Sequence, residues 1–81
     1  MTKKEKGTLL NNLRKHWEQA LKAKINEDVS QPAINMLVDY AQGYRKACID
    51  VLSVGYGSQK RAIYMVSVII EQVEQDLSAS L

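Results

Sequence analysis

Two side chains of this chain have the chemistry of a general base or a nucleophile, His16 and Cys48. His16 has no cysteine, serine, aspartate or glutamate three or four residues away, so a helix would give it no catalytic neighbour. Cys48 follows Arg45 by three residues, and a nearby cation is what activates a thiol. Its other helical neighbours are apolar, and a free cysteine in such surroundings is typically a small buried side chain. We therefore predict no catalytic residue and no enzyme activity.

Acidic side chains gather near the end of the chain, at Glu71, Glu74 and Asp76. Two carboxylates three residues apart on a helix can share a Mg²⁺ ion. A metal-dependent enzyme would need a second acidic pair on a facing helix, and Glu27-Asp28 lies in a predicted linker. One histidine and one cysteine cannot supply the ligands of a zinc site. We therefore predict no metal ion and no other cofactor.

A glycine-rich stretch, Gly55-Tyr56-Gly57-Ser58, is followed by Gln59-Lys60-Arg61. Backbone N–H groups and two cations at the start of a helix can hold a phosphate group. The same residues are what a tight turn between two helices requires. The turn is a simpler interpretation than a phosphate site. Both interpretations predict that a helix begins after Ser58.

The net charge of +2 conceals an uneven distribution of charge. Residues 1–25 hold seven Lys/Arg against two acids, whereas residues 26–81 hold four against seven. A basic segment of this kind pairs with acidic groups of its own fold or with an acidic partner such as nucleic acid. If the cations shared one face, the candidate phosphate contacts would be Lys3, Lys4, Lys6, Arg14, Lys15, Lys22, Lys60 and Arg61.

A dimeric nucleic-acid-binding regulator that uses this basic N-terminal third is our alternative hypothesis. No helix-turn-helix is legible in the sequence, because such a motif needs polar, base-reading side chains after a short turn. The helix predicted after Gly57 instead presents Ile63, Tyr64 and Met65, which are typical packing residues. Nucleic acid therefore stays a second choice among the partners.

Three helices account for the spacing of apolar residues. The first is predicted over residues 8–25 with Thr8 as its N-cap, after a flexible basic segment over residues 1–7. The second is predicted over residues 30–54, because Pro32 suits the first turn of a helix. The third is predicted over residues 58–77, followed by a frayed tail over 78–81 because acids in a last turn oppose the helix dipole.

A β-hairpin is the competing interpretation of residues 48–70, because valine, isoleucine and tyrosine favour strands. The helical spacing continues without a break to Val73 and Leu77, however, and an isolated hairpin is barely stable. We therefore predict an all-α fold with a single helical domain. Helices two and three form an antiparallel hairpin, and helix one packs across it.

The helix predicted over residues 30–54 is apolar around more than half of its circumference. Such a helix needs cover from two directions. A chain of 81 residues is too small to provide this cover easily, and it has no disulfide or metal to stabilise it instead. We therefore expect two copies to associate into a homodimeric helical bundle.

Core and interface positions follow from the helical faces. The predicted core consists of Ile34, Val38, Ala41, Cys48, Leu52, Ile63, Val66, Ile70 and Val73, closed on one side by Leu13, Trp17 and Leu21. Large apolar groups outside this set need a partner to cover them. The predicted protein interface comprises Trp17, Tyr40, Tyr44, Tyr64, Met65 and Val68.

The sequence thus favours a small non-catalytic interaction module, an adaptor, inhibitor or regulator, that acts as a homodimer and presents a helical surface to a protein partner. The longest mainly apolar run without charge, residues 62–70, is too short to span a bilayer. No apolar signal follows the charged N-terminus, and a lone cysteine fits a reducing compartment. We therefore expect no membrane partner and a cytoplasmic location.

Overall fold

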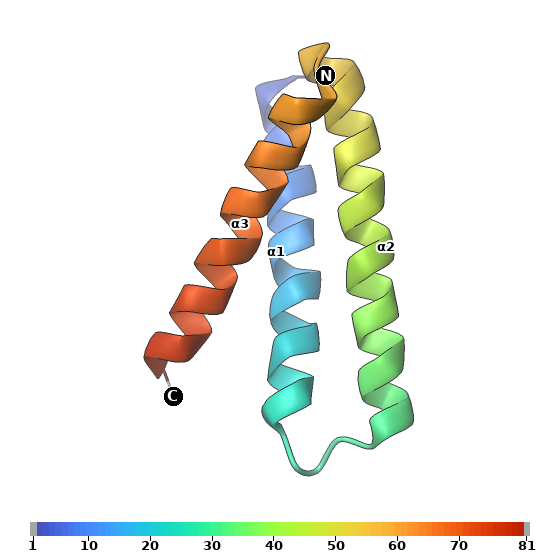
Figure 1. The fold of residues 1–81 in the computed structure, drawn as a ribbon, viewed down its shortest axis with the longest axis vertical. Helices are drawn as coiled ribbons and strands as arrows, with labels where there is room; N and C mark the ends of the chain where they lie inside the picture. Colours follow the sequence, from blue (N-terminus) through green and yellow to red (C-terminus); the bar gives the residue numbers. More distant parts are fainter. Residues whose placement is uncertain (1, 81) are drawn as a thin grey trace.

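A computed structural model of the chain describes residues 2–80 and folds them into three α-helices, with no strand in that range (Figure 1). The helices are α1 (Lys3–Ile25), α2 (Gln31–Tyr56) and α3 (Gln59–Ser80). The predicted all-α, three-helix fold is confirmed, and the alternative hairpin over residues 48–70 is excluded. Within residues 2–80, no helix has the length and hydrophobicity needed to cross a membrane.

The first helix, α1, begins at Lys3, five residues earlier than predicted. Its N-cap is Thr2, whose hydroxyl oxygen accepts a hydrogen bond from the backbone N–H of Glu5 at 3.1 Å. The same hydroxyl donates to Oε1 of Glu5 at 3.0 Å. Thr-x-x-Glu is the sequence pattern of a capping box, so this start was legible in the sequence.

Thr8, the predicted N-cap, lies inside α1 instead. Its hydroxyl donates to the carbonyl oxygen of Lys4, one turn earlier, at 3.0 Å. Threonine commonly satisfies its side chain in this way within a helix. The predicted flexible segment is therefore wrong for residues 3–7, which are helical, and Met1 lies outside the described residues.

A short turn over residues 26–30 connects α1 to α2. The side-chain oxygen of Asn26 accepts a hydrogen bond from the backbone N–H of Asp28 at 2.9 Å, which makes an Asx turn. Ser30 precedes α2, and its backbone carbonyl accepts from the N–H of Ile34 at 3.0 Å. Pro32 lies in the first turn of α2 as predicted, where its missing N–H leaves no bond unmade.

The turn between α2 and α3 depends on Gly57. Its φ of 65° lies in the left-handed region, where glycine ends many helices. Gly55 remains helical, so α2 ends at Tyr56, two residues beyond the predicted end. The hydroxyl oxygen of Ser58 then accepts from the N–H of Arg61 at 3.2 Å and caps α3. The glycine-rich stretch is therefore a turn between helices, as its simpler interpretation predicted.

The last helix, α3, continues to Ser80, three residues beyond its predicted end. Residues 78–80 are helical, so the prediction that helix ends before them is wrong, and Leu81 lies outside the described residues. Glu74 and Asp76 are exposed. Solvent and salt screen their unfavourable interaction with the helix dipole, which is too small to end the helix.

The three helices alternate in direction (Figure 1). α1 packs against both helices of the α2–α3 pair and runs alongside α2, whereas α3 diverges toward its C-terminal end. The radius of gyration is 13.5 Å, against about 12 Å for a compact chain of this length. The divergence of α3 therefore leaves one end of the bundle packed and the other open.

The core lies where the three helices converge. Its best-buried cluster consists of Leu13, Cys48, Leu52, Ala62, Val66 and Ile69. Six of the predicted core positions are buried, namely Leu13, Ala41, Cys48, Leu52, Val66 and Val73. Five others are half-buried, because α3 has moved away from them: Trp17, Leu21, Ile34, Val38 and Ile70.

Ile63 does not belong to the core, contrary to prediction. Its side chain is 41% exposed, whereas the neighbouring Ala62 is completely buried. Successive helical residues point about 100° apart, so only one of the two can face α1 and α2. The buried face of α3 is centred between Ala62 and Ile69, which places the smaller alanine at the close contact and turns Ile63 toward solvent.

Candidate interaction surfaces

His16 lies at the contact between α1 and α2. Its ring centroid is 4.8 Å from that of Tyr44 and 6.0 Å from that of Tyr40. Within residues 2–80, no three histidine, cysteine or acidic side chains come close enough to hold a metal ion, and this includes the acidic end of α3. The neighbours of His16 are thus aromatic side chains, which it helps to position on α2.

Cys48 is completely buried in the core, with Sγ 4.0 Å from the carbonyl oxygen of Leu9. Burial raises the pKa of the Cys48 thiol to about 11, because a thiolate loses its hydration in an apolar environment. This shift is opposite to the one that Arg45 would cause if it activated the thiol. The Cys48 side chain is therefore a packing group.

We expect the Cys48 thiol to react slowly with a disulfide reagent such as DTNB in the folded protein. At mildly alkaline pH, a pKa about two units above normal reduces the thiolate population roughly 100-fold, and burial blocks access. The rate should rise sharply once urea unfolds the chain. Equal rates in the folded and unfolded protein would show that the thiol is exposed and contradict this assignment.

A row of exposed apolar side chains runs along α2. We call it the α2 stripe and define it by the residues Met36, Tyr40, Gly43, Ala47, Val51 and Val54. Consecutive members are three or four residues apart, which keeps them on one side of a helix. Tyr40 is 66% and Val54 is 85% exposed. Apart from the His16 ring beside Tyr40, the stripe extends along α2 without cover from the described residues.

The centre of the α2 stripe is made of small residues, Gly43 and Ala47. A Cβ atom at Gly43 would meet nothing within 4 Å in this chain. Glycine inside a helix costs about 1 kcal/mol relative to alanine, and no contact within the described chain requires it here. The small side chains leave a shallow region in the stripe, between Tyr40 and Val51, where another backbone can approach closely.

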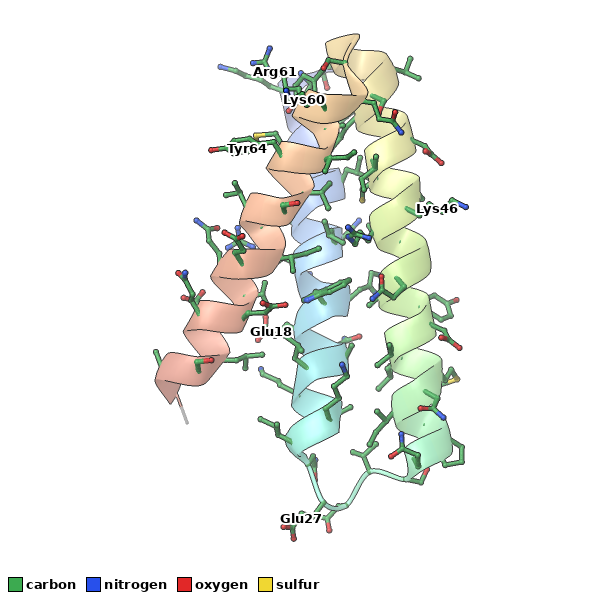
Figure 2. All side chains as sticks on the ribbon, viewed as in Figure 1. Glu18, Glu27, Lys46, Lys60, Arg61 and Tyr64 are labelled. Atoms are coloured by element: carbon green, nitrogen blue, oxygen red, sulfur yellow. The ribbon has the colours of Figure 1, made fainter. Side chains whose placement is uncertain are left out.

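The predicted protein interface does not form one surface. Tyr40 is exposed in the α2 stripe, whereas Tyr44 is half-buried against the core. Tyr64 projects from the outer side of α3 (Figure 2). Met65 and Val68, also on α3, are half-buried. Large apolar side chains that the prediction of the interface omitted, Met36, Val51 and Val54, accompany Tyr40 instead, and their helical spacing was already visible in the sequence.

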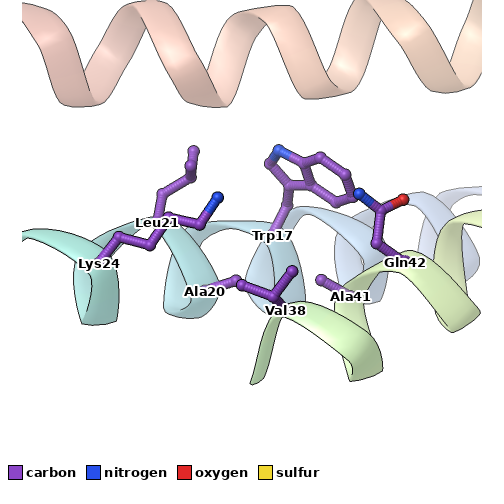
Figure 3. A pocket seen from close by; sticks show the side chains of 7 residues that line it. All are labelled: Trp17, Ala20, Leu21, Lys24, Val38, Ala41 and Gln42. Carbon is purple, nitrogen blue, oxygen red and sulfur yellow. The ribbon is translucent and has the colours of Figure 1, made fainter. Parts of the chain in front are cut away.

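Trp17 lies in a hollow between α1 and α2 (Figure 3). The hollow is lined by Trp17, Ala20, Leu21, Lys24, Val38, Ala41 and Gln42. Its volume of about 30 Å³ leaves room for water but not for a metabolite. The indole Nε1 of Trp17 is buried and has no hydrogen-bond partner among the described residues.

Two of the predicted phosphate-contacting cations are engaged within the chain. Arg14 donates from Nη2 to Oε1 of Gln72 at 3.4 Å, which joins α1 to α3. Nζ of Lys22 lies 2.7 Å from Oε1 of Glu18. This ion pair lowers the pKa of the Glu18 carboxyl, through the hydrogen bond and the charge of Lys22.

The other predicted cations are divided between two places. Lys15 is exposed in the middle of α1. The remaining five lie in the first turns of α1 and α3, which start at the same end of the bundle (Figures 1 and 2). We call them the basic end: Lys3, Lys4, Lys6, Lys60 and Arg61.

Tyr56, the last residue of α2, connects the two halves of the basic end. Nζ of Lys6 lies 4.3 Å from the centroid of the Tyr56 ring, and Cζ of Arg61 lies 5.0 Å from it. Cation–π contacts of this kind stabilise exposed side chains by roughly 0.5–1 kcal/mol. Cations that are more than fifty residues apart in sequence are thereby held around one ring.

The chain exposes more surface than a compact protein of its size. Its accessible surface is 5700 Å², whereas the average monomer of 9.1 kDa exposes about 4900 Å². The excess of about 800 Å² equals the area that one partner buries in a standard protein–protein interface.

No protein-family model, no curated protein and no solved structure matches this chain.

Proposed function

We propose that this chain is a small, non-catalytic helical interaction module that works as a homodimer, with the α2 stripes of two copies packed against each other. The observation that carries the proposal is the α2 stripe itself, because four large exposed apolar side chains on one side of a helix are costly to leave in water. In this role, the dimer is the working unit of an adaptor, inhibitor or regulator.

The shape of the α2 stripe favours a second copy of the chain as the occupant. In an antiparallel pair whose twofold axis crosses the stripe midway between Tyr40 and Gly43, Tyr40 of one copy faces Gly43 of the other. Met36 likewise faces Ala47. Large side chains then meet small ones on both sides of the axis, and such pairing lets two helices pack closely.

The charges beside the stripe favour the same antiparallel arrangement. Asp39 and Lys46 both lie next to the stripe on α2, and Lys46 points away from the rest of the bundle (Figure 2). In the antiparallel pair, Asp39 of each copy comes within two residues of the position opposite Lys46 of the other, about 3 Å along the helix, which the long lysine side chain can span. In a parallel pair this flank of each helix would face the other flank of its partner, so Asp39 and Lys46 would not meet.

The test is the mass of the protein in solution as a function of concentration, measured by sedimentation velocity and by light scattering after gel filtration. We expect the mass to rise from that of one 9.1 kDa chain at low micromolar loading toward twice that value at high loading. A single-copy species at every loading up to millimolar would refute the proposal. A larger, open-ended assembly would also refute it, because a twofold pair closes.

A further inference from the structure

We infer that the basic end, together with Tyr64, binds single-stranded nucleic acid: the cations hold phosphates and the Tyr64 ring stacks on a base. This inference goes beyond the proposed dimer and does not depend on it, because every residue involved belongs to one copy. The surface lies at the start of α1 and α3, away from the middle of the α2 stripe (Figures 1 and 2).

The first supporting observation is that the positive charges of the basic end are scarcely balanced. Glu5 is the acidic residue in the first turn of α1, against Lys3, Lys4 and Lys6 of the basic end. The first turn of α3 contains no acidic residue. Five cations and the starts of two helices therefore create a local positive potential, which attracts phosphate groups.

The second observation is the way in which cations from the two helices are held together. Lys6 on α1 and Arg61 on α3 lie over the same Tyr56 ring. Packing cations side by side costs repulsion, and this cost is relieved when phosphate oxygens lie between them. The arrangement joins charges from the starts of the first and third helices into one surface.

The third observation is the exposed ring of Tyr64 beside these charges. Its side chain is 67% exposed. Tyr64 lies three and four residues after Arg61 and Lys60, so the three side chains share a helix face, and Figure 2 shows them projecting near one another. A ring for base stacking beside cations for the backbone is the common arrangement of proteins that bind single strands.

The rest of α3 favours a short single strand over a rigid duplex or a membrane. Beyond Tyr64, the exposed side of α3 carries Glu71 and Glu74. A duplex or an anionic bilayer that lay along α3 would meet these carboxylates and be repelled. A flexible strand can contact the first two turns of α3 and then turn away.

The test is fluorescence anisotropy with a fluorescein-labelled oligothymidylate, repeated with oligouridylate, over a series of salt concentrations. We expect binding at low salt that weakens steeply as salt rises. Tyr64→Ala should weaken binding roughly 5- to 150-fold, whereas Tyr64→Phe, which keeps the ring, should bind like the parent protein.

The charge test compares two double variants that lose the same net charge. Lys60→Gln with Arg61→Gln should reduce the slope of log K against log salt by about 1.4, because each phosphate contact to a single strand contributes about 0.7. Lys15→Gln with Lys24→Gln removes two exposed cations elsewhere on α1 and should leave the slope nearly unchanged. Circular dichroism verifies that each variant is folded.

Several outcomes would overturn the inference. These are no anisotropy change at low salt, an equal loss of binding in both double variants, or no effect of Tyr64→Ala. Tighter binding to a duplex competitor, or binding to phosphatidylserine vesicles in place of the oligonucleotides, would also overturn it. Tyr64→Ala should leave the sedimentation of the protein unchanged, so this inference and the proposed dimer can fail separately.

Discussion

Truncation of Leu52 to alanine is expected to lower the free energy of unfolding by about 3–4 kcal/mol. The Leu52 side chain is completely buried in the cluster where all three helices meet, so its loss leaves a cavity that the surrounding side chains cannot fill. A domain of 81 residues has a total stability of roughly 4–12 kcal/mol. Much of the fold therefore depends on this one side chain. Urea denaturation followed by circular dichroism measures the change.

Ile25→Ala is the matched control for Leu52→Ala. The Ile25 side chain is 53% exposed at the end of α1, so its truncation should change the free energy of unfolding by only about 0.5 kcal/mol. Both variants should be measured at two protein concentrations, because a dimer makes the unfolding midpoint depend on concentration. Equal effects of the two truncations would show that the core does not lie where the three helices converge.

The limits of the helices were predictable to the extent that the sequence contains local signals for them. Pro32 and the turn before Ser58 were recognised, and α2 and α3 start where these residues indicate. The start of α1 was missed although its signal is equally local. Two threonines precede apolar residues, but only Thr2 has a glutamate three residues later, and this capping box decides between them.

The packing of α3 could not be predicted from its own apolar spacing. The apolar face of α3 is wide enough that either Ala62 or Ile63 could be buried. At the start of α3 the helices α1 and α2 approach closely, and only the smaller alanine fits between them. The divergence of α3 has the same origin, because it depends on how three helices fit together rather than on one face. Half-burial of Val38 and Ile70 follows from that divergence.

Of the two candidate surfaces, the α2 stripe could be predicted from the sequence and the basic end could not. The α2 stripe is a local feature of one helix, so its residues can be read from a helical wheel of α2. The basic end is not local, because it combines the start of α1 with the start of α3. Our prediction from the sequence grouped these cations with Arg14 and Lys22. In the structure, Arg14 instead bonds to Gln72 and Lys22 pairs with Glu18.

Replacement of Ala47 by arginine is expected to weaken the proposed dimer at least 100-fold. Ala47 lies at the small centre of the α2 stripe, opposite Met36 of the second copy in the antiparallel pair. A long, charged side chain would separate the two helices and place an unpaired charge in an apolar contact, which costs about 3 kcal/mol or more. The monomer should keep its fold, because Ala47 is exposed and arginine is a good helix former.

The control for Ala47→Arg is Gln42→Arg, which adds the same charge to an exposed position on the opposite side of α2. Sedimentation velocity at a loading where the parent protein is dimeric should find Ala47→Arg as a single copy and Gln42→Arg as a dimer. A dimer that persists in Ala47→Arg would place the contact elsewhere on the molecule. Dissociation in both variants would mean that net charge, rather than the α2 stripe, controls association, because only contact at the stripe makes the two positions differ.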